Sequence, residues 1–316
     1  MAPGAPITIP NTRQVQFVSK LNGHRYAISV ALPFAAAPAK GYAVLYVLDG
    51  YWYFASAAEV VRMIGNPSGV VVVGIGYPDD AAYAKQVLVR RGPVPTYLAG
   101  LPPSRSSPYL ERTYDLTLPA SDAALTTEAL AGTPTLQSQN VGGLDDLLKI
   151  IEVDVKPRVA ALTHIDAANQ ALFGHSFGGL AALHALFVEP NAFRSFIIAS
   201  PSIAWNNKRV LADEDGFAST VNTGLAKPRV LITVGGEEST PEKFPASWGI
   251  DNAAADAYLR KLRMVESANE LVLRLQQLHG MWPYLVEGAV FDRQGHSASA
   301  WSALARGISF AFKDSD

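Results

Sequence analysis

Polar and apolar residues alternate near the start of the chain and then give way to continuous apolar runs. The alternating segments Gln14–Ser19 and Arg25–Leu32 flank the turn-forming pair Asn22-Gly23, which predicts two antiparallel strands joined as a hairpin. The apolar runs Tyr42–Leu48 and Val70–Ile75 are typical of strands buried on both faces, as in a parallel sheet. The N-terminal part therefore predicts a hairpin followed by two parallel strands.

The pattern of a helix with one buried face returns further along the chain. Four apolar residues between Leu144 and Ile151 follow the i, i+3, i+4, i+7 spacing of such a helix. Pro157 should kink or restart it. Strands and helices then alternate, which predicts a doubly wound α/β sheet. The expected elements are helices at Phe54–Ile64, Phe177–Glu189, within Asp251–Leu278 and at Ala298–Phe312, and strands at Gln170–Phe173, Phe196–Ser200, Arg229–Val234 and Tyr284–Phe291.

Regularity lapses from about Pro78 to Asn140. This stretch is rich in Pro, Gly, Ser and Thr, most clearly at Leu101–Pro108. A loop of that length inside a compact domain is uncommon unless it serves as a lid or a substrate-binding segment. A disordered surface insertion is the other interpretation. No repeat or linker divides the chain, so we expect one α/β domain over residues 1–316, with a lid or substrate-binding insertion at about 78–140.

Composition narrows the class of protein without changing this picture. Hydrophobic residues make up 49% of the chain and charged residues 17%, with a formal net charge of -2 and no block of like charges. We therefore expect no nucleic-acid partner, which would need clustered Lys and Arg, and no membrane span, because no apolar run is long enough. The chain has no cysteine, which excludes disulfides, thiolate catalysis and zinc–thiolate or iron–sulfur sites. Met1–Pro6 lacks the features of a signal peptide, which favours the cytoplasm unless a signal has been removed.

The segment Gly174-His175-Ser176-Phe177-Gly178 matches the pattern G-x-S-x-G. It lies directly between an apolar strand and a helix that opens with Gly178-Gly179, which is the strand–turn–helix context that this pattern requires. Such a turn holds the serine in strained backbone angles and projects its hydroxyl above the sheet, while the first amides of the helix face developing negative charge. We therefore predict that Ser176 is the nucleophile of an α/β-hydrolase fold.

A serine hydroxyl needs a base to react at neutral pH, and histidine is the usual one. In this fold the chain order is serine, acid, histidine, so the base must follow the last strands, which leaves His279 and His296. His279 precedes Gly280 at a predicted helix end, where a capping role is ordinary. His296 lies in a loop after the last strand, at the sheet edge where the sites of open α/β folds form. The sequence therefore favours His296.

The acid is expected in the loop after the strand at Val230–Val234. Glu237 and Glu238 follow there, and one of the two carboxylates would orient His296 and stabilise its imidazolium. Asp251 lies further on and is better suited to cap the helix that begins there. Glu238 is favoured, with Glu237 and Asp251 as alternatives.

Five segments spread over nearly the whole chain carry a further signal. They are Val47-Leu48-Asp49-Gly50, Gly174-His175-Ser176-Phe177-Gly178-Gly179, Ala199-Ser200-Pro201-Ser202, Val234-Gly235-Gly236-Glu237-Glu238 and Gly295-His296-Ser297. Together they resemble the putative-esterase family of α/β hydrolases, which includes enterobactin and other trilactone siderophore esterases, esterase D-like enzymes and mycolyltransferases. The resemblance and the element order imply a mostly parallel, doubly wound sheet with an N-terminal hairpin and a long insertion after the second parallel strand.

The resemblance also implies roles for individual residues. The acid of such enzymes ends a V-G-x-x-[DE] segment, which points to Glu238. The residue after the D-G pair looks like the second oxyanion donor, so the backbone N–H of Tyr51 would act beside that of Phe177, while Asp49 itself would only form a turn. Arg112 resembles the arginine of an R-x-x-D segment and either faces an acidic substrate or pairs with Asp115. Trp205 resembles the tryptophan of an S-x-x-W stretch and either lines the pocket or packs.

These residues predict a serine esterase that works through an acyl-enzyme on a small-molecule ester. The mechanism requires no metal and no organic cofactor. An acyltransferase on the same scaffold is the first alternative, and a non-catalytic binding protein on a hydrolase fold is the second. The resemblance makes a trilactone siderophore the leading specific substrate, with a small aromatic or short-chain acyl ester as the broader expectation.

Overall fold

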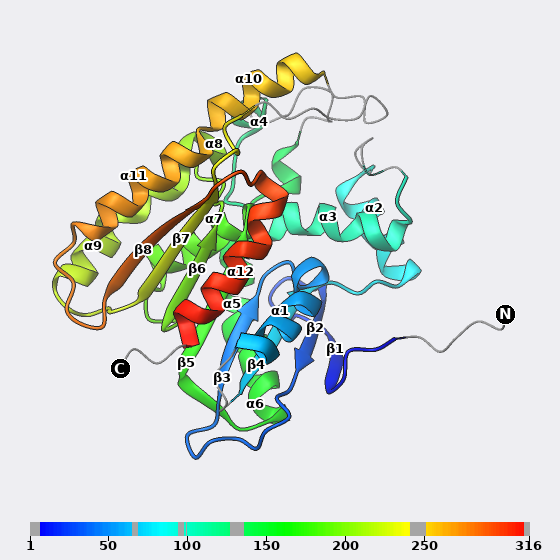
Figure 1. The fold of residues 1–316 in the computed structure, drawn as a ribbon. Helices are drawn as coiled ribbons and strands as arrows, with labels where there is room; N and C mark the ends of the chain where they lie inside the picture. The colour runs from blue at the N-terminus through cyan, green and yellow to red at the C-terminus, as the bar shows by residue number, and fades with distance from the viewer. Residues whose placement is uncertain are drawn as a thin grey trace.

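Eight strands form one sheet in the part of the chain that the computed structural model describes, which is residues 7–64, 69–93, 98, 100–126, 136–240 and 251–312. The strands are β1 Thr12–Val18, β2 Arg25–Ala31, β3 Tyr42–Val47, β4 Val70–Gly76, β5 Ile165–His175, β6 Ser195–Ala199, β7 Arg229–Gly235 and β8 Leu285–Phe291. They lie in the order β1-β2-β4-β3-β5-β6-β7-β8 (Figure 1).

The pairing of the strands confirms the predicted sheet. β1 and β2 form an antiparallel hairpin and β2 pairs antiparallel with β4, whereas the neighbours from β4 through to β8 are all parallel. Gly23 in the hairpin turn has a φ of 71°, which glycine adopts without strain. The strands β4, β6 and β7 are buried along their whole length, as their unbroken apolar runs indicated. The expected N-terminal hairpin and long insertion after the second parallel strand are both present.

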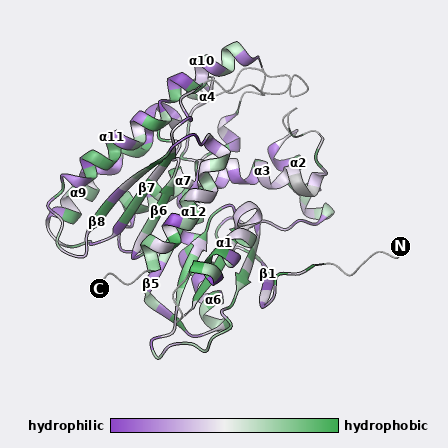
Figure 2. Cartoon of the chain, in the orientation of Figure 1, coloured by the Kyte–Doolittle hydropathy of each residue, from purple (hydrophilic) through white to green (hydrophobic). Residues whose placement is uncertain are grey.

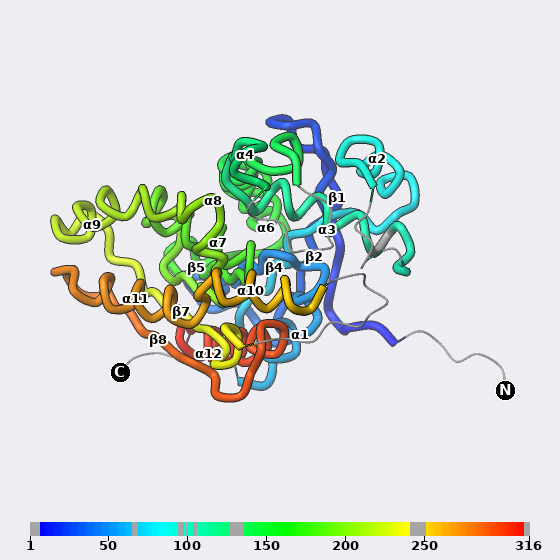
Figure 3. The backbone as a smooth tube through the Cα atoms, turned by 90° about the horizontal axis from the view of Figure 1, so that it is seen from above, coloured from blue at the N-terminus to red at the C-terminus, as the bar shows by residue number. Residues whose placement is uncertain are grey.

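Helices cover both faces of this sheet. They are α1 Gly50–Ile64, α2 Ala81–Arg91, α3 Pro103–Asp115, α4 Asp122–Leu125, α5 Leu144–Ile150, α6 Lys156–Leu162, α7 Phe177–Val188, α8 Trp205–Lys208, α9 Glu214–Asn222, α10 Asn252–Leu262, α11 Met264–Gln276 and α12 His296–Phe312, with the 3-10 turns η2 Ser138–Asn140 and η4 Arg209–Asp213 and the π-helical turn η3 Ile151–Val155. One apolar core lies under α5, α6, α7, α9 and α11, and the other under α1 and α12. Figure 3 shows α1 and α12 on one side of the sheet and α6, α7 and α9 on the other. Figure 2 shows hydrophobic residues along the central strands, while α10 is more hydrophilic. Within the described ranges, no helix is long and apolar enough to cross a membrane.

Outside the insertion, the helices differ from the expected pattern in two places. The single long helix expected within Asp251–Leu278 is divided into α10 and α11 at Arg263, whose φ is 48°. No Gly or Pro marks this break, so the local sequence carries no signal for it. Between β6 and β7 the chain forms α8, η4 and α9, where no element was predicted. The expected restart at Pro157 is present, because this residue lies in the first turn of α6 after the π-helical turn η3.

The insertion at 78–140 is more regular than its composition indicated. In its described part the chain forms α2, α3, α4 and η2. Asp80 and Ser121 accept hydrogen bonds from backbone N–H groups in the first turns of α2 and α4. Pro103 is the first residue of α3, where a missing N–H is tolerated. Several polar residues and prolines that resembled a loop are therefore helix starts.

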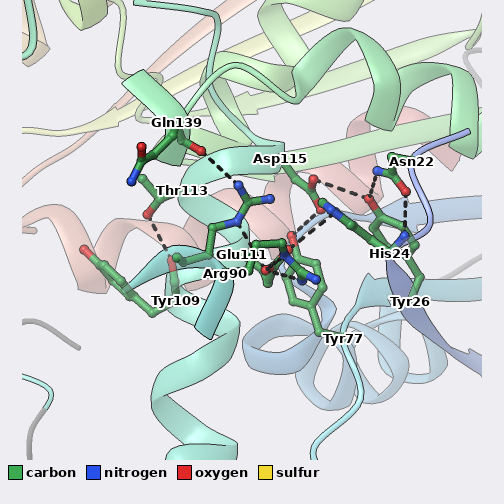
Figure 4. A network of polar contacts seen from close by, with 11 residues as sticks. Asn22, His24, Tyr26, Tyr77, Arg90, Tyr109, Glu111, Thr113, Asp115 and Gln139 are labelled. Carbon is green, nitrogen blue, oxygen red and sulfur yellow. Dashed lines mark hydrogen bonds and ion pairs between the residues drawn. The ribbon is translucent and has the colours of Figure 1, made fainter. Parts of the chain in front are cut away.

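A buried polar network joins this insertion to the N-terminal strands (Figure 4). Glu111 of α3 is fully buried, and its Oε1 accepts hydrogen bonds from two arginine side chains of α2, the shorter of 2.6 Å. Asp115, one turn further along α3, accepts from the hydroxyls of Tyr26 in β2 and Tyr77 after β4, at 3.3 Å and 3.0 Å. The network therefore attaches α2 and α3 to the edge of the sheet.

The position of Asp115 has a consequence for stability. Burial raises the pKa of this carboxyl to about 8, and the nearby charge of Glu111 adds to the shift, although the tyrosine hydroxyls oppose it. In the unfolded chain an Asp has a pKa of about 3.9. Between these two values the folded state retains a proton that the unfolded chain has released, so the free energy of unfolding should fall as pH rises through this window.

The variant Asp115→Asn tests this consequence. Because an amide does not titrate, the variant should lose most of the fall in unfolding free energy between about pH 5 and about pH 8. Urea denaturation at several pH values measures it. Asp80→Asn is the control, since hydrogen bonds to the Tyr83 backbone and to Arg25 lower the pKa of Asp80 and confine its titration to acid pH. A wild-type slope that persists in Asp115→Asn would contradict the prediction.

Candidate active site

Ser176 lies in a tight turn between β5 and α7. Its backbone angles are φ 62° and ψ −118°, a conformation that costs a residue with a side chain about 1–3 kcal/mol. A Cβ on Gly174 would stand 1.9 Å from the carbonyl oxygen of Gly178, and one on Gly179 would stand 2.5 Å from that of Ala199. The glycines of the motif are therefore required for the close approach of α7 to the strands.

Backbone hydrogen bonds hold this strained turn. The N–H of Ser176 donates to the carbonyl oxygen of Ala199 at the end of β6, at 3.0 Å. Its own carbonyl accepts from the N–H groups of Leu180 and Ser202, at 2.9 Å and 3.2 Å. Ser176 is half-buried and lies at the carboxyl end of the central strands. The turn is thus anchored both to its own helix and to the neighbouring strand.

His296 and Glu238 are joined by a hydrogen bond at the same edge of the sheet. Nδ1 of His296, the first residue of α12, lies 2.7 Å from Oε2 of Glu238, which lies in the turn after β7. The side chain of His296 is 37% exposed and that of Glu238 only 1%. The histidine is therefore reachable by a small molecule, while its carboxylate partner is shielded from water.

Glu238 is held in its ionised form by several donors. Burial would raise its pKa, but the bond with His296 and those from the Ser200 hydroxyl and the Gly235 N–H outweigh it, so the pKa lies below the ordinary value. Oε1 accepts from Ser200 Oγ at 2.5 Å, from the Gly235 N–H at 2.7 Å and from Ser299 Oγ at 2.9 Å. An anionic partner at Nδ1 favours the tautomer of His296 in which Nε2 carries the lone pair.

The other candidate acids lie elsewhere. Glu237 is exposed, and its backbone N–H donates to the carbonyl of Gln294. Asp251 accepts from two N–H groups in the first turn of α10 and is the cap that the sequence indicated. The alternative base, His279, is exposed beyond the end of α11, where its backbone N–H donates to the side chain of Asn222. The structure thus brings Glu238, and neither alternative, to His296.

Tyr51 and Phe177 occupy matching positions on neighbouring elements. Tyr51 is the second residue of α1, which follows β3, and Phe177 is the first residue of α7, which follows β5. β3 and β5 are parallel neighbours, so both helices begin at the same edge of the sheet. Gly50 allows α1 to approach β4, because a Cβ there would stand 2.5 Å from the backbone of Gly74. The N-termini of two helices therefore converge beside Ser176.

Arg112 pairs with a residue that neither of its two sequence-based interpretations named. Its guanidinium binds Asp49 through two hydrogen bonds, Nε to Oδ1 at 2.7 Å and a terminal nitrogen to Oδ2 at 2.8 Å. Of the two interpretations of Arg112, the pairing with Asp115 is not present, because Asp115 accepts hydrogen bonds from Tyr26 and Tyr77 instead. Arg112 is only 6% exposed, and Asp49, for which only a turn was expected, adopts a φ of 53°.

Trp205 is buried rather than open to solvent. It is 3% exposed, its indole N–H donates to the carbonyl of Leu118 at 3.2 Å, and its ring meets that of Phe177 edge-on at 5.2 Å. Of the two sequence-based interpretations, this geometry fits packing. Its neighbour Phe177 lies between it and the site.

Sequence reasoning assigned no role to the serines that bind Glu238. Ser200 has a φ of 42° and follows β6, and Ser299 lies one turn after His296 on α12. The spacing of Ser299 from His296 was the only local signal for either contact. Pairing across the ends of β6, β7 and α12 is a property of the fold, so the pattern of the sequence alone does not reveal it.

Three residues near the hairpin bring ligand-type atoms within 4.8 Å of one another: His24, Glu111 and Asp115. Arg90 and Arg91 already bind the Glu111 carboxylate. Asp115 retains its proton up to about pH 8, so the two guanidinium groups already outweigh the single negative charge of Glu111, and a divalent cation would add uncompensated positive charge to a buried place. The charges of this cluster therefore fit a structural network better than a metal site.

Comparison with known proteins finds relatives along almost the whole chain. A model of the family described as "Putative esterase" matches residues 121–277. The ferri-bacillibactin esterase BesA of Bacillus subtilis is 29% identical over 311 residues, which cover 96% of this chain and 90% of BesA. The siderophore enterobactin esterase of Emericella nidulans is 32% identical over 253 residues, which cover 76% of this chain and 74% of that protein.

The fold agrees with that of a solved relative. The BES protein from Bacillus cereus superposes with a TM-score of 0.73 and 30% sequence identity, over 99% of this chain and 100% of that one. The resemblance drawn from the five sequence segments is confirmed. The 32% identity over 76% of the chain and the shared architecture show that this chain belongs to the α/β-hydrolase family described as "Putative esterase" and is a carboxylic ester hydrolase.

Proposed function

We propose that this esterase works through an acyl-enzyme on Ser176, with His296 as base and Glu238 as orienting acid. The observation that carries the proposal is the 2.7 Å contact between His296 Nδ1 and the buried Glu238 carboxylate, beside the strained turn at Ser176. With its Nδ1 proton held by an anion, the imidazole presents Nε2 as the acceptor for the serine proton.

In the proposed reaction, Ser176 Oγ attacks the ester carbonyl while its proton passes to His296 Nε2. Glu238 stabilises the imidazolium, and the N–H groups of Tyr51 and Phe177 donate to the oxyanion. The tetrahedral intermediate expels the alcohol, which takes the proton from His296. Water then repeats the sequence on the acyl-enzyme and releases the acid.

The substrate we propose is a siderophore ester, with a trilactone as the leading candidate. The curated relatives are named as esterases of ferri-bacillibactin and enterobactin. Trp52 follows the proposed oxyanion donor Tyr51 and is 38% exposed, and its ring meets that of Tyr109, on α3 of the insertion, edge-on at 6.3 Å. We call these two rings the aromatic wall, and a surface of this kind suits a bulky substrate. Such a wall, shared by α1 and the insertion, gives the stretch at 78–140 its proposed part in substrate binding.

Arg112 and Trp205 are proposed to act from behind this wall. The Arg112 guanidinium lies 5.1 Å from the Trp52 ring and 5.4 Å from the Phe177 ring, and it holds the Asp49 turn from which α1 begins. Trp205 supports Phe177 from the other side. Both residues would then shape the pocket through the side chains that face it.

Removal of the proposed nucleophile or base should abolish turnover. Ser176→Ala and His296→Ala should each lower kcat for p-nitrophenyl acetate by a factor on the order of 10⁶, with unchanged circular dichroism, because the two residues act as one unit. His279→Ala should remain near wild type, since that side chain is exposed and remote. A Ser176→Ala variant that keeps a tenth of the activity would refute the assignment.

Glu238→Gln should be less damaging than loss of the nucleophile. An orienting acid acts through the tautomer of His296, so kcat should fall by roughly 10²–10⁴-fold. The matched change Glu237→Gln should leave kcat near wild type, because that carboxylate faces solvent. Steady-state kinetics on one ester compares the two. Small and equal losses would instead indicate a Ser–His dyad without a dedicated acid.

Trp52→Ala should separate bulky from minimal substrates. A trilactone draws binding energy from remote contacts that p-nitrophenyl acetate does not make, so KM should rise at least about tenfold for the trilactone and little for the acetate. The control is Trp282→Ala. Trp282 is also exposed, but it precedes β8 and so lies at the amino end of that strand, whereas Trp52 follows the carboxyl end of β3. Equal effects on both esters would remove the aromatic wall from the proposal.

A further inference from the structure

His175, the residue before the nucleophile, is buried between the elements that carry the proposed catalytic residues. It is 4% exposed and ends β5. Its Nε2 lies 2.9 Å from the carbonyl oxygen of His296, and its Nδ1 lies 3.0 Å from the hydroxyl of Tyr53. Both ring nitrogens therefore have partners, and one of them belongs to the proposed base.

The partners determine where the His175 proton lies. A carbonyl oxygen only accepts, so Nε2 must carry the proton and donate it to His296. Nδ1 then has a lone pair, and the Tyr53 hydroxyl is its donor. A second proton on the ring would remove the acceptor that Tyr53 needs. Burial, with the neighbouring His296 as a further cause, lowers the pKa of His175 to about 3, so the ring stays neutral as this geometry requires.

The rings of His175 and His296 are also in contact. Their centroids are 4.5 Å apart, with the planes inclined by 41°. The side chain of His296 is 37% exposed, so few other groups restrict its rotation on the open side. Its Nδ1 bond to Glu238 sets one end of the ring, and the face of His175 limits the tilt about that bond.

Tyr53 connects this contact to a third element. It belongs to α1, two residues after Tyr51, and its ring packs edge-on against Phe173 of β5 and Trp301 of α12. Tyr53 is itself only 8% exposed. The hydroxyl of Tyr53 and the imidazole of His175 thus link the start of α1, the end of β5 and the start of α12.

We propose that His175, as a neutral Nε2–H imidazole held by Tyr53, is a positioning residue that sets the place of His296 relative to Ser176. The inference rests on the proposed function, because it concerns the same serine and histidine. The His175 ring is buried, so it should not contact the bound ester. Its effect should therefore fall on the chemical step and leave the affinity for the ester nearly unchanged.

Two substitutions separate the ring from its hydrogen bonds. His175→Phe retains a ring and loses both bonds, so kcat for p-nitrophenyl acetate should fall by roughly 10–100-fold with KM within about twofold, since a misplaced base weakens proton transfer. His175→Gln retains an amide donor and acceptor and should recover about tenfold of that loss. Tyr53→Phe removes only the donor to Nδ1 and should give a smaller loss in kcat. It also tests the proposal if His175→Phe fails to fold.

His184→Phe is the matched control. His184 is equally buried, at 4% exposure, but lies on α7 with its Nε2 2.8 Å from Asp145, on the far side of the helix from these contacts. This variant should lower the melting temperature without lowering kcat. An equal fall in kcat for His184→Phe and His175→Phe, or no recovery in His175→Gln, would overturn the proposal.

Labelling by a fluorophosphonate tests the role of Ser176 separately from the role of His175. This probe reports the reactivity of Ser176 without a bound ester, and its rate should fall in His175→Phe by the same factor as kcat. A wild-type chain that resists the probe would refute the proposed function and, with it, the role of His175. Labelling of His175→Phe and Tyr53→Phe at the wild-type rate would overturn the role of His175 alone.

Discussion

The site depends on how closely the first turn of α7 passes over the end of β5. The space for a side chain is missing at Gly174 and again at Gly179, where backbone atoms of the facing elements stand 1.9 Å and 2.5 Å from any added Cβ. Ser176 lies between these two contacts, so its positive φ is imposed from both sides. The same approach places the first N–H groups of α7 beside Ser176, where the proposed mechanism forms its oxyanion. One steric constraint therefore positions both the proposed nucleophile and one of the proposed oxyanion donors.

The two buried carboxylates of the site are satisfied in opposite ways. Asp49 binds a full positive charge on Arg112, so the pair has little net field beyond its own contacts. Glu238 is surrounded by neutral donors, two hydroxyls and one backbone N–H, and its remaining negative charge faces His296. A cation that develops on the imidazole thus meets an uncompensated anion. The first carboxylate serves structure, and the second is placed to serve electrostatics.

Local patterns predicted the eight strands in their chain order, and they singled out Ser176, His296 and Glu238 as candidates that the structure places at one end of the sheet. These features are encoded in short segments: an apolar run, a glycine-flanked serine, a histidine after the last strand. The partners of Arg112, the serines around Glu238 and the break at Arg263 were not predictable in this way, because each depends on elements distant in sequence or on packing. The helices of the insertion were missed for another reason, since caps and prolines at helix starts have the composition of a loop.

Two sets of contacts attach helix α3 to the rest of the fold. Arg112 binds Asp49, while Glu111 and Asp115 bind side chains of α2, of β2 and of the segment after β4. A conformation with α3 lifted from the Asp49 turn would have to break the two charge-assisted hydrogen bonds of Arg112 together. Such a conformation should therefore be a minor one. A large ester would therefore contact α3 as a fixed surface. The shape of that surface, rather than the frequency of an opening motion, would govern the access of the ester to Ser176.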